Sequence, residues 1–363
     1  MSVLPPSAAA RSAGSSRRSS ALTVAIAGAT GAVGQEFLRV LEQRNFPIGE
    51  LRLLASSRSA GKTMLFGGRE VVVSDLAEES FEGVDIALFS AGGSISQAIA
   101  PRAVEAGAVV IDNSSAFRMT AGVPLVVPEV NPEAVGDLAI GSKPGIIANP
   151  NCSTIIALVA VTPIHRTVGI ERMVVSTYQA ASGAGAAAMA ELEQQTREVL
   201  EGKPPTCKIF SQQYAFNVFS HNSDIGPEGY NTEEMKLVKE THKIWDQAEG
   251  DRTAITATCV RVPVLRAHSE AINLTLRKPM GEDEARRLLA AAAGVSIIDD
   301  RAANRFPTPL EASGLDDVFV GRIRRDISQA EGMGLDLLVC GDQIRKGAAL
   351  NAVQIAELLV GRS

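Results

Sequence analysis

The sequence predicts an α/β protein whose first half is a doubly wound parallel sheet. Short buried-strand patterns alternate with helical patterns from residue 22 to about residue 150, as in such sheets. A glycine-rich loop joins the first strand to the first helix. The length of 363 residues is enough for about two domains, so we expect a second, α+β domain to follow.

The composition is that of a globular protein, with 45% hydrophobic and 21% charged residues. A net charge of −6 gives no overall bias toward nucleic acid or anionic membranes, and we expect neither partner. The four cysteines form no CxxC pair, so they indicate neither a metal site nor a disulfide framework. The longest apolar stretches, such as residues 154–164, are too short to span a bilayer.

Residues 1–21 are set apart from the fold. Residues 1–20 contain Arg11, Arg17 and Arg18, many Ser and Ala residues, and no acidic residue. They lack the apolar segment of a secretory signal, so the composition favours an organelle transit peptide, and with it the plastid stroma. The alternative is a disordered tail on a cytoplasmic protein.

The first strand pattern, residues 22–27, runs directly into a glycine-rich loop and then a helical pattern. A dinucleotide fingerprint requires this context, because glycines let the backbone approach a pyrophosphate at the helix N-terminus. Thr30 interrupts the usual GxGxxG spacing, so the loop is a variant of that fingerprint. The expected cofactor-binding residues are Gly28, Thr30, Gly31, Ala32, Val33 and Gly34.

The second strand, residues 50–55, ends in Ser56-Ser57-Arg58-Ser59 rather than in a carboxylate. An arginine flanked by hydroxyls suits a 2′-phosphate, so Arg58, Ser57 and Ser59 predict NADP(H) rather than NAD(H). The alternative is a solvated surface arginine.

Further strand patterns cover residues 70–73, 84–89 and 108–111, with a helix over residues 96–106. In a parallel sheet the ligand site lies at the carboxyl ends of the strands. The segments that follow two of these strands are therefore candidates, namely Ser90-Ala91-Gly92 for the cofactor and residues 112–118 for a ligand.

Cys152 is the candidate nucleophile. It stands in Asn149-Pro150-Asn151-Cys152-Ser153-Thr154, before the apolar run 155–161. Pro150 disfavours helix at Asn149, and Ser153 and Thr154 are capping residues, so Cys152 is expected where a turn becomes a helix. Unpaired N–H groups there would lower the thiol pKa. The alternative is a buried core cysteine.

A polar constellation follows in the second half. The strand pattern 172–177 leads to Gln179, which could orient a carbonyl substrate, and to a small-residue loop with Ser182 and Gly183. Asn231 begins a helix with an acidic first turn. From spacing alone, Glu233 and Lys236 on that helix are more typical of surface charges.

Among the four histidines, His268 is the candidate partner for Cys152, because it lies between two strand patterns. His242 has the surroundings of a helix surface, His221 lies in a polar loop, and His165 lies beyond the Cys152 helix. Arg261 and His268 have opposite parity, so only a bend near Pro263 would direct both into one pocket. Spacing alone does not place His268 beside Cys152.

From Val24 almost to the C-terminus the chain resembles the aspartate-β-semialdehyde dehydrogenase family, in its Gram-positive and plastid-like branch. Eight segments in family order carry the resemblance: GATGAVG (28–34), SSRSAG (56–61), NSSAFR (113–118), NPNCST (149–154), YQAASGAG (178–185), EEMK (233–236), RVPV…HSE (261–270) and KGAALNAVQIAE (346–357).

The resemblance implies residue roles. Cys152 resembles the family nucleophile, His268 the general acid/base, Gln179 the residue that orients the substrate, and Arg261 the clamp for its α-carboxylate. Glu233 matches a carboxylate that meets the substrate amino group. The positions that match phosphate-binding residues are Arg118 and Lys236, with Asn113 nearby. Gln343 matches a position near the nicotinamide, with Ser182 and Gly183 also at the cofactor.

The implied activity is the reversible, NADP-dependent reduction of L-4-aspartyl phosphate to aspartate semialdehyde through a cysteine thioester. This reaction belongs to lysine, threonine, methionine and isoleucine biosynthesis, and it takes inorganic phosphate in the oxidative direction. The alternatives are N-acetyl-γ-glutamyl-phosphate reductase, which has a similar fold, and a non-catalytic NADP-binding regulator.

The resemblance also implies a domain organisation. We expect a Rossmann-type domain over residues 22–150, a catalytic and dimerisation domain over residues 151–343, and a C-terminal helix, residues 344–363, that returns to the first domain. A homodimer or homotetramer is expected.

Overall fold

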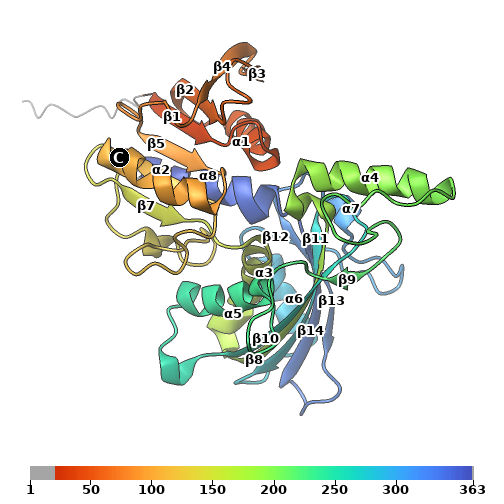
Figure 1. Ribbon diagram of the computed structural model, residues 1–363. Coiled ribbons are helices and arrows are strands. Elements are labelled where there is room, and N and C mark those ends of the chain that lie inside the picture. Colours follow the sequence, from red (N-terminus) through yellow and green to blue (C-terminus); the bar gives the residue numbers. More distant parts are fainter. Residues whose placement is uncertain (1–20, 362–363) are drawn as a thin grey trace, which may run out of the picture.

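The computed structural model describes residues 21–361 as two lobes, each built on a seven-stranded sheet (Figure 1). Apart from Ala21, the segment expected to be a transit peptide lies outside the described residues. None of the helices between residues 21 and 361 is long and apolar enough to cross a membrane.

The first sheet confirms the predicted fold class. Its strands are parallel except for the edge strand β3, which runs antiparallel to β4. The strands, in sheet order, are β3 (Thr63–Phe66), β4 (Arg69–Asp75), β2 (Ile48–Ala55), β1 (Leu22–Ala27), β5 (Ile86–Phe89), β6 (Val109–Asp112) and β7 (Gly145–Ala148).

Helices cover both faces of this sheet, as a doubly wound topology requires. On one face, α1 (Ala32–Gln43) and α8 (Leu350–Val360) share a core with β1. On the other, α2 (Gly93–Glu105) packs Ile99, Ala100 and Ala103 against the sheet. The C-terminal helix α8 is thus part of the core of the first lobe, although the whole second lobe separates it in sequence from β7.

The second sheet is mixed. Its strands, in sheet order, are β12 (Val295–Ile297), β13 (Val318–Arg325), β14 (Gly334–Gly341), β11 (His268–Leu276), β8 (Ile170–Gln179), β10 (Ala254–Arg261) and β9 (Phe219–Ser220). The long strand β8 lies between β11, which is antiparallel to it, and β10, which is parallel. The ends of β8, β10 and β11 therefore bring Gln179, Arg261 and His268 to one edge of the sheet.

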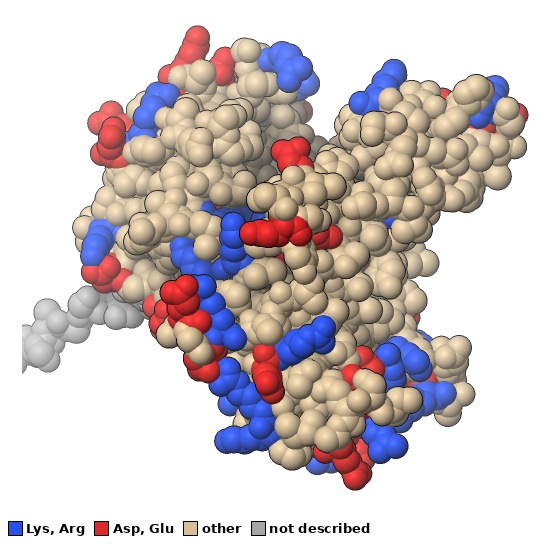
Figure 2. Space-filling model, turned by 60° about the horizontal axis from the view of Figure 1, so that its bottom comes forward, with Lys and Arg blue, Asp and Glu red and all other residues tan. Residues whose placement is uncertain are grey.

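Three helices pack into the core that this sheet shares: α3 (Cys152–Val168), α5 (Thr232–Ile244) and α6 (Glu282–Ala290). The α3 helix is buried over most of its surface. A fourth helix, α4 (Ala186–Leu200), projects from the body as an arm with charged residues at its end (Figures 1 and 2). On the face drawn in Figure 2, Lys and Arg alternate with Asp and Glu and form no single broad patch.

Short helices complete the fold: η1 (Pro132–Val135), η2 (Ala181–Ala184), η3 (Glu249–Asp251), α7 (Pro309–Ala312) and the π-helix η4 (Arg345–Ala349), which leads into α8. Sequence patterns predicted most strands of the first sheet but missed β3 and β7. Missing β7 matters most, because this strand pairs with β6 and the chain continues from it to Asn149 and Cys152.

Candidate active site

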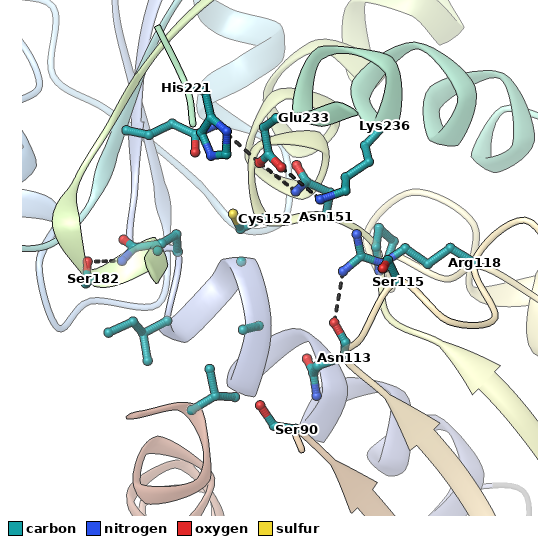
Figure 3. Close-up of a pocket in the computed structure, with 18 of the residues that line it drawn as sticks. Ser90, Asn113, Ser115, Arg118, Asn151, Cys152, Ser182, His221, Glu233 and Lys236 are labelled. Atoms are coloured by element: carbon teal, nitrogen blue, oxygen red, sulfur yellow. Dashed lines mark hydrogen bonds and ion pairs between the residues drawn. The ribbon is translucent and has the colours of Figure 1, made fainter. Parts of the chain in front are cut away.

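A cavity of about 340 Å³ opens between the lobes at the first turn of α3 (Figure 3). The first lobe contributes Ser90 and Asn113, which follow β5 and β6, and the second contributes Gln179 and Arg261. Cys152, four residues after the end of β7, lines the same cavity. The carboxyl ends of the parallel strands therefore face the ends of β8 and β10 across one space.

Cys152 is the first residue of α3, as the sequence predicted. The predicted caps were wrong, however, because Asn151 caps this helix. Its Oδ1 accepts hydrogen bonds from the backbone N–H groups of Ser153 and Thr154, at 3.1 and 3.3 Å. The N–H groups expected to be free for a thiolate are therefore already partnered.

The expected lowering of the thiol pKa is also wrong. Burial, followed by the charge of Glu233, raises the pKa of Cys152 to about 12, against the opposing effects of Arg118 and Lys236. The thiol is therefore neutral at physiological pH, and it can become a thiolate only by passing its proton to another group.

Glu233 is the centre of a hydrogen-bonded group beside Cys152. Its Oε1 accepts from Nδ2 of Asn151 at 2.8 Å and from Nε2 of Gln179 at 3.3 Å, and its Oε2 pairs with Nζ of Lys236 at 2.9 Å (Figure 3). Burial raises the pKa of Glu233, but Lys236 and His221 outweigh it and lower the pKa to about 2. Glu233 is thus an ionised cavity residue, and not the surface charge that its spacing suggested.

Arg118 is held in place by three hydrogen-bond acceptors. Its Nε donates to the carbonyl of Asn149, its Nη2 to the carbonyl of Asn113, and its Nη1 pairs with Glu240 at 3.0 Å. Glu240 also accepts from the backbone N–H of Asn151 at 2.6 Å. This buried carboxylate therefore connects the guanidinium to the turn that carries the thiol.

Glu240 was missed by the sequence reasoning. The available signal was the spacing of Glu233, Lys236, Glu240 and Lys243, which lie on one face of α5 because they are three or four residues apart. The structure turns this face toward the cavity, and Lys243 donates to the carbonyls of Arg118 and Thr120.

Arg261 ends β10 and is 4% exposed. Its Nε donates to Oδ1 of Asn222 at 3.2 Å and its Nη1 to the carbonyl of Ala180 at 3.3 Å. Its guanidinium carbon lies 5.6 Å from the centre of the Phe210 ring. The guanidinium is thus held in place by residues of the second lobe.

His268 begins β11 and lies directly behind the cavity wall. Gly183 forms this part of the wall, and a Cβ added there would come 3.2 Å from Nε2 of His268. Nδ1 accepts the backbone N–H of Ala180 at 3.1 Å, while Nε2 is a buried atom without a partner among the described residues. Burial and Arg261 lower the pKa to about 3, so the imidazole is neutral.

A second cavity, of about 620 Å³, lies over the glycine-rich loop. Ser90 lines both cavities, so they adjoin there. Of the predicted cofactor residues, seven line this groove: Gly28, Thr30, Gly31, Ser57, Arg58, Ser90 and Ala91. Four more line the first cavity, namely Val33, Ser182, Gly183 and Gln343.

Ala32, Gly34, Ser59 and Gly92 line neither cavity. Gly34 has a packing role instead, because an added Cβ would come 2.3 Å from the carbonyl oxygen of Gly28. Gly28 has a φ of +89°, and a Cβ there would come 2.3 Å from the carbonyl oxygen of Ser90. Both glycines therefore permit the close approach of backbones that a dinucleotide loop requires.

No group of three or more His, Cys, Asp or Glu residues in the described range, 21–361, is arranged to hold a metal ion.

Comparison with known proteins agrees with this assembly of fold and site. Residues 23–138 match the domain described as semialdehyde dehydrogenase, NAD binding domain, and residues 161–346 match semialdehyde dehydrogenase, dimerisation domain. The fold and the two adjoining cavities thus define an oxidoreductase of the semialdehyde dehydrogenase class.

Particular relatives narrow the assignment. A Synechocystis protein named aspartate-semialdehyde dehydrogenase is 57% identical over 343 residues, covering 94% of this chain and 98% of the relative. A namesake from Legionella pneumophila is 53% identical, covering 93% of this chain and 95% of the relative. The chain therefore belongs to the aspartate-semialdehyde dehydrogenase family.

Solved structures agree. A Vibrio cholerae aspartate semialdehyde dehydrogenase II, described as complexed with ASA, has a TM-score of 0.89 at 49% identity, covering 94% of this chain and 98% of that one. An aspartate semialdehyde dehydrogenase with NADP from Candida albicans has a TM-score of 0.72 at 27% identity, with coverage of 94% and 98%.

Proposed function

We propose that this protein interconverts L-4-aspartyl phosphate and L-aspartate 4-semialdehyde with NADP(H), through a thioester at Cys152. One observation carries the proposal: Cys152 lines one cavity together with the cations Arg118, Lys236 and Arg261, and that cavity adjoins the nucleotide groove at Ser90. A four-carbon substrate with a carboxylate at one end and a phosphoryl group at the other would bring one anion to Arg261 and the other to Arg118 and Lys236.

The substrate's amino-acid end fits the Arg261 side. A guanidinium can bind a carboxylate through two hydrogen bonds, which fixes its orientation better than a lysine would. Glu233, ionised and within the same cavity, offers an oxygen to the substrate's ammonium group. Gln179 reaches Ser153 and Glu233 through Nε2, so its side chain is fixed beside the reacting carbon.

The phosphoryl group fits the Arg118 side. Arg118 and Lys236 both line the cavity, and Asn113 lies next to Arg118. Arg118 already has three protein acceptors, so it supplies positive charge in a fixed position, while Lys236 pairs with Glu233 alone among residues 21–361. We infer that Lys236 makes the more adaptable contact with phosphate.

In the oxidative direction, Sγ of Cys152 bonds to the aldehyde carbon, the C=O π bond opens, and the proton of the thiol ends on the substrate oxygen, which gives a hemithioacetal. NADP⁺ held in the adjoining groove would supply the acceptor for the hydride on that carbon, and loss of the hydride together with the hydroxyl proton leaves a thioester. An oxygen of inorganic phosphate then attacks the thioester carbon, the C–S bond breaks, and Cys152 regains its thiolate while aspartyl phosphate leaves. Reduction follows the reverse order. Thiolate suits both directions because it is a good nucleophile and a good leaving group.

His268 would manage the proton on the substrate oxygen. Because Nδ1 accepts the N–H of Ala180, the neutral ring carries its proton on Nε2. This tautomer can donate to an oxygen that becomes negative when the carbonyl carbon is attacked. It reaches the cavity only past Gly183, which has no side chain in the way.

NADP(H) fits the groove because the loop geometry leaves room for a pyrophosphate, and Arg58 lines the groove between two serines. Arg58 is exposed and has no ion-pair partner within residues 21–361, so its charge is free for a ligand. The Candida albicans relative described with NADP supports the same choice.

Replacing Arg58 by Ala is expected to raise the Michaelis constant for NADP(H) about 10- to 100-fold, the loss typical of a charge-assisted hydrogen bond to phosphate. The constant for NAD(H) should change less than about twofold, because that cofactor has no 2′-phosphate. Steady-state kinetics with both cofactors measures this. Arg69→Ala, a surface arginine in β4, is the matched control, and equal losses for both cofactors would remove Arg58 from the 2′-phosphate site.

The proposed reaction has a direct assay, which is NADPH formation from L-aspartate semialdehyde. It should require inorganic phosphate, since phosphate is the group that splits the thioester. N-Acetylglutamate semialdehyde should be a poor substrate, because an acetylated nitrogen carries no charge for Glu233. Phosphate-dependent turnover of the acetylated substrate alone would support the alternative reductase instead.

The match to a dimerisation domain supports our proposal of a homodimer or a dimer of dimers. Location in the plastid stroma stays a prediction that rests on the composition of residues 1–20.

A further inference from the structure

His221 is a cavity residue that the sequence did not single out. It follows the short strand β9, whose Phe219 is paired with Arg261 of β10. The backbone N–H of His221 donates to the carbonyl of Cys259 at 2.9 Å, which extends this pairing by one residue. The register therefore places His221 opposite Cys259 and diagonal to Arg261, and its imidazole lines the cavity near Glu233 (Figure 3).

The residues after His221 hold the neighbouring groups in position. Asn222 accepts from Nε of Arg261, and the hydroxyl of Ser223 accepts from the backbone N–H of Glu233 at 3.1 Å. Three consecutive residues thus contact the proposed carboxylate clamp, the proposed ammonium partner and the cavity itself. We therefore expect residues 221–223 to lie at the same end of a bound ligand as Arg261 and Glu233.

The hydrogen bonds of the ring determine what His221 can offer. Nδ1 accepts the backbone N–H of Ser223 at 3.3 Å and lies 3.1 Å from its hydroxyl. Burial, followed by the charge of Arg261, lowers the pKa of His221 to about 4, so the ring is neutral near pH 7. A neutral ring whose Nδ1 accepts carries its proton on Nε2. Nε2 has no partner in the described part of the chain, and is therefore a free donor.

Arg261 alone does not provide all the hydrogen bonds that a carboxylate can accept. Its Nε is bonded to Asn222 and its Nη1 to the carbonyl of Ala180, so only part of the guanidinium faces the cavity with unused protons. A carboxylate has two oxygens and about four lone-pair positions. A second donor on the same side would complete its binding.

We infer that His221 is a substrate-binding residue whose Nε2–H donates to the α-carboxylate of the amino-acid substrate alongside Arg261. The inference rests on the proposed function, because it takes the substrate's carboxylate to lie at Arg261. His221 would then help the protein to select aldehydes that carry an α-carboxylate over aldehydes that lack one.

The test compares His221→Ala with His221→Gln. The alanine variant should raise the Michaelis constant for aspartate semialdehyde about 10- to 100-fold, because it loses a hydrogen bond to a charged group. The constants for phosphate and NADP⁺ should stay within about twofold. Glutamine, whose amide nitrogen can stand near the position of Nε2, should restore part of the loss. His242→Ala, on α5 outside the cavity, is the matched control and should behave as the wild type.

A second substrate separates this role from a structural one. 3-Aminopropanal is the same amino-aldehyde without the carboxylate. His221→Ala should lower kcat/KM for aspartate semialdehyde while leaving that for 3-aminopropanal nearly unchanged. An equal loss for both substrates, or no loss for either, would overturn the inference. If thermal melting shows that His221→Ala does not fold, the two substrates are compared with His221→Gln instead, for which a smaller selective loss is expected.

The activity of the wild-type enzyme separates the proposed reaction from the proposed role of His221. If it fails to form NADPH from aspartate semialdehyde and phosphate, the proposed function has failed. If it turns over normally and the two substrates respond alike to His221→Ala, only the role of His221 has failed.

Discussion

Replacing Cys152 by Ala is expected to abolish turnover, with a loss of at least about 10⁴-fold in kcat, as for removal of a covalent nucleophile. No other cysteine of the described residues lines the cavity, so no second thiol can form the thioester. Binding of NADPH should be retained, because the nucleotide groove does not include Cys152. Phosphate-dependent NADPH formation and a fluorescence titration of NADPH measure the two properties.

The substitution is conservative in shape. Gly347 packs so closely on this residue that an added Cβ would come 2.8 Å from Cβ of Cys152, and alanine keeps that Cβ. Cys207→Ala, an exposed cysteine outside the cavity, is the control and should retain full activity. Turnover of Cys152→Ala within about tenfold of the wild type would contradict the covalent mechanism.

Replacing His268 by Asn should lower kcat about 10²- to 10⁴-fold, the usual contribution of a positioned acid or base. The reason is the loss of the Nε2 proton that we assign to the substrate oxygen. The thermal midpoint should be measured in parallel, since the bond from the N–H of Ala180 to Nδ1 is lost with the ring unless the asparagine side chain replaces it. NADPH binding should again be retained.

His242→Asn makes the same substitution outside the cavity, where Nε2 lies 2.9 Å from the carbonyl oxygen of Thr253. It should retain activity. The role of His268 would be wrong if its variant melted like the wild type and kept its kcat, because Gly183 would then separate the ring from the chemistry as well as from the cavity surface.

Local patterns predicted the first lobe well. The strand predicted over residues 22–27 matches β1, and those near residues 50–55 and 108–111 correspond to β2 and β6. Buried parallel strands are apolar on both faces, so their runs stand out against the turns that bound them. The strand β7 was missed because it has only four residues and begins with a glycine directly after Pro144.

The sequence was least informative about electrostatics. It predicted a reactive thiol at a helix N-terminus, and the position was correct. The pKa of the thiol, however, depends on burial and on the charges of Glu233, Lys236 and Arg118, which belong to two other parts of the chain. No local window contains the distances among such groups.

His221 and Glu240 show the same limit. His221 lies in a polar loop of the sequence and Glu240 lies in a charged helical stretch, and neither residue differs from its sequence neighbours in a way that indicates function. Pairing of β9 with β10 brings His221 to Arg261, and the packing of α5 brings Glu240 to Arg118. His221 and Arg261 are 40 residues apart in the chain, and Glu240 and Arg118 are 122 residues apart.

The sequence by itself determined the alternation of strands and helices, the nucleotide loop, and the helix start at Cys152, because propensity, hydrophobic period and turn chemistry act over a few residues. Only the tertiary structure decided which charges surround the thiol, and that His268 lies behind Gly183 while His221 lines the cavity. Those outcomes depend on strand order, register and burial, which arise when distant segments pack together and exclude water from the groups between them.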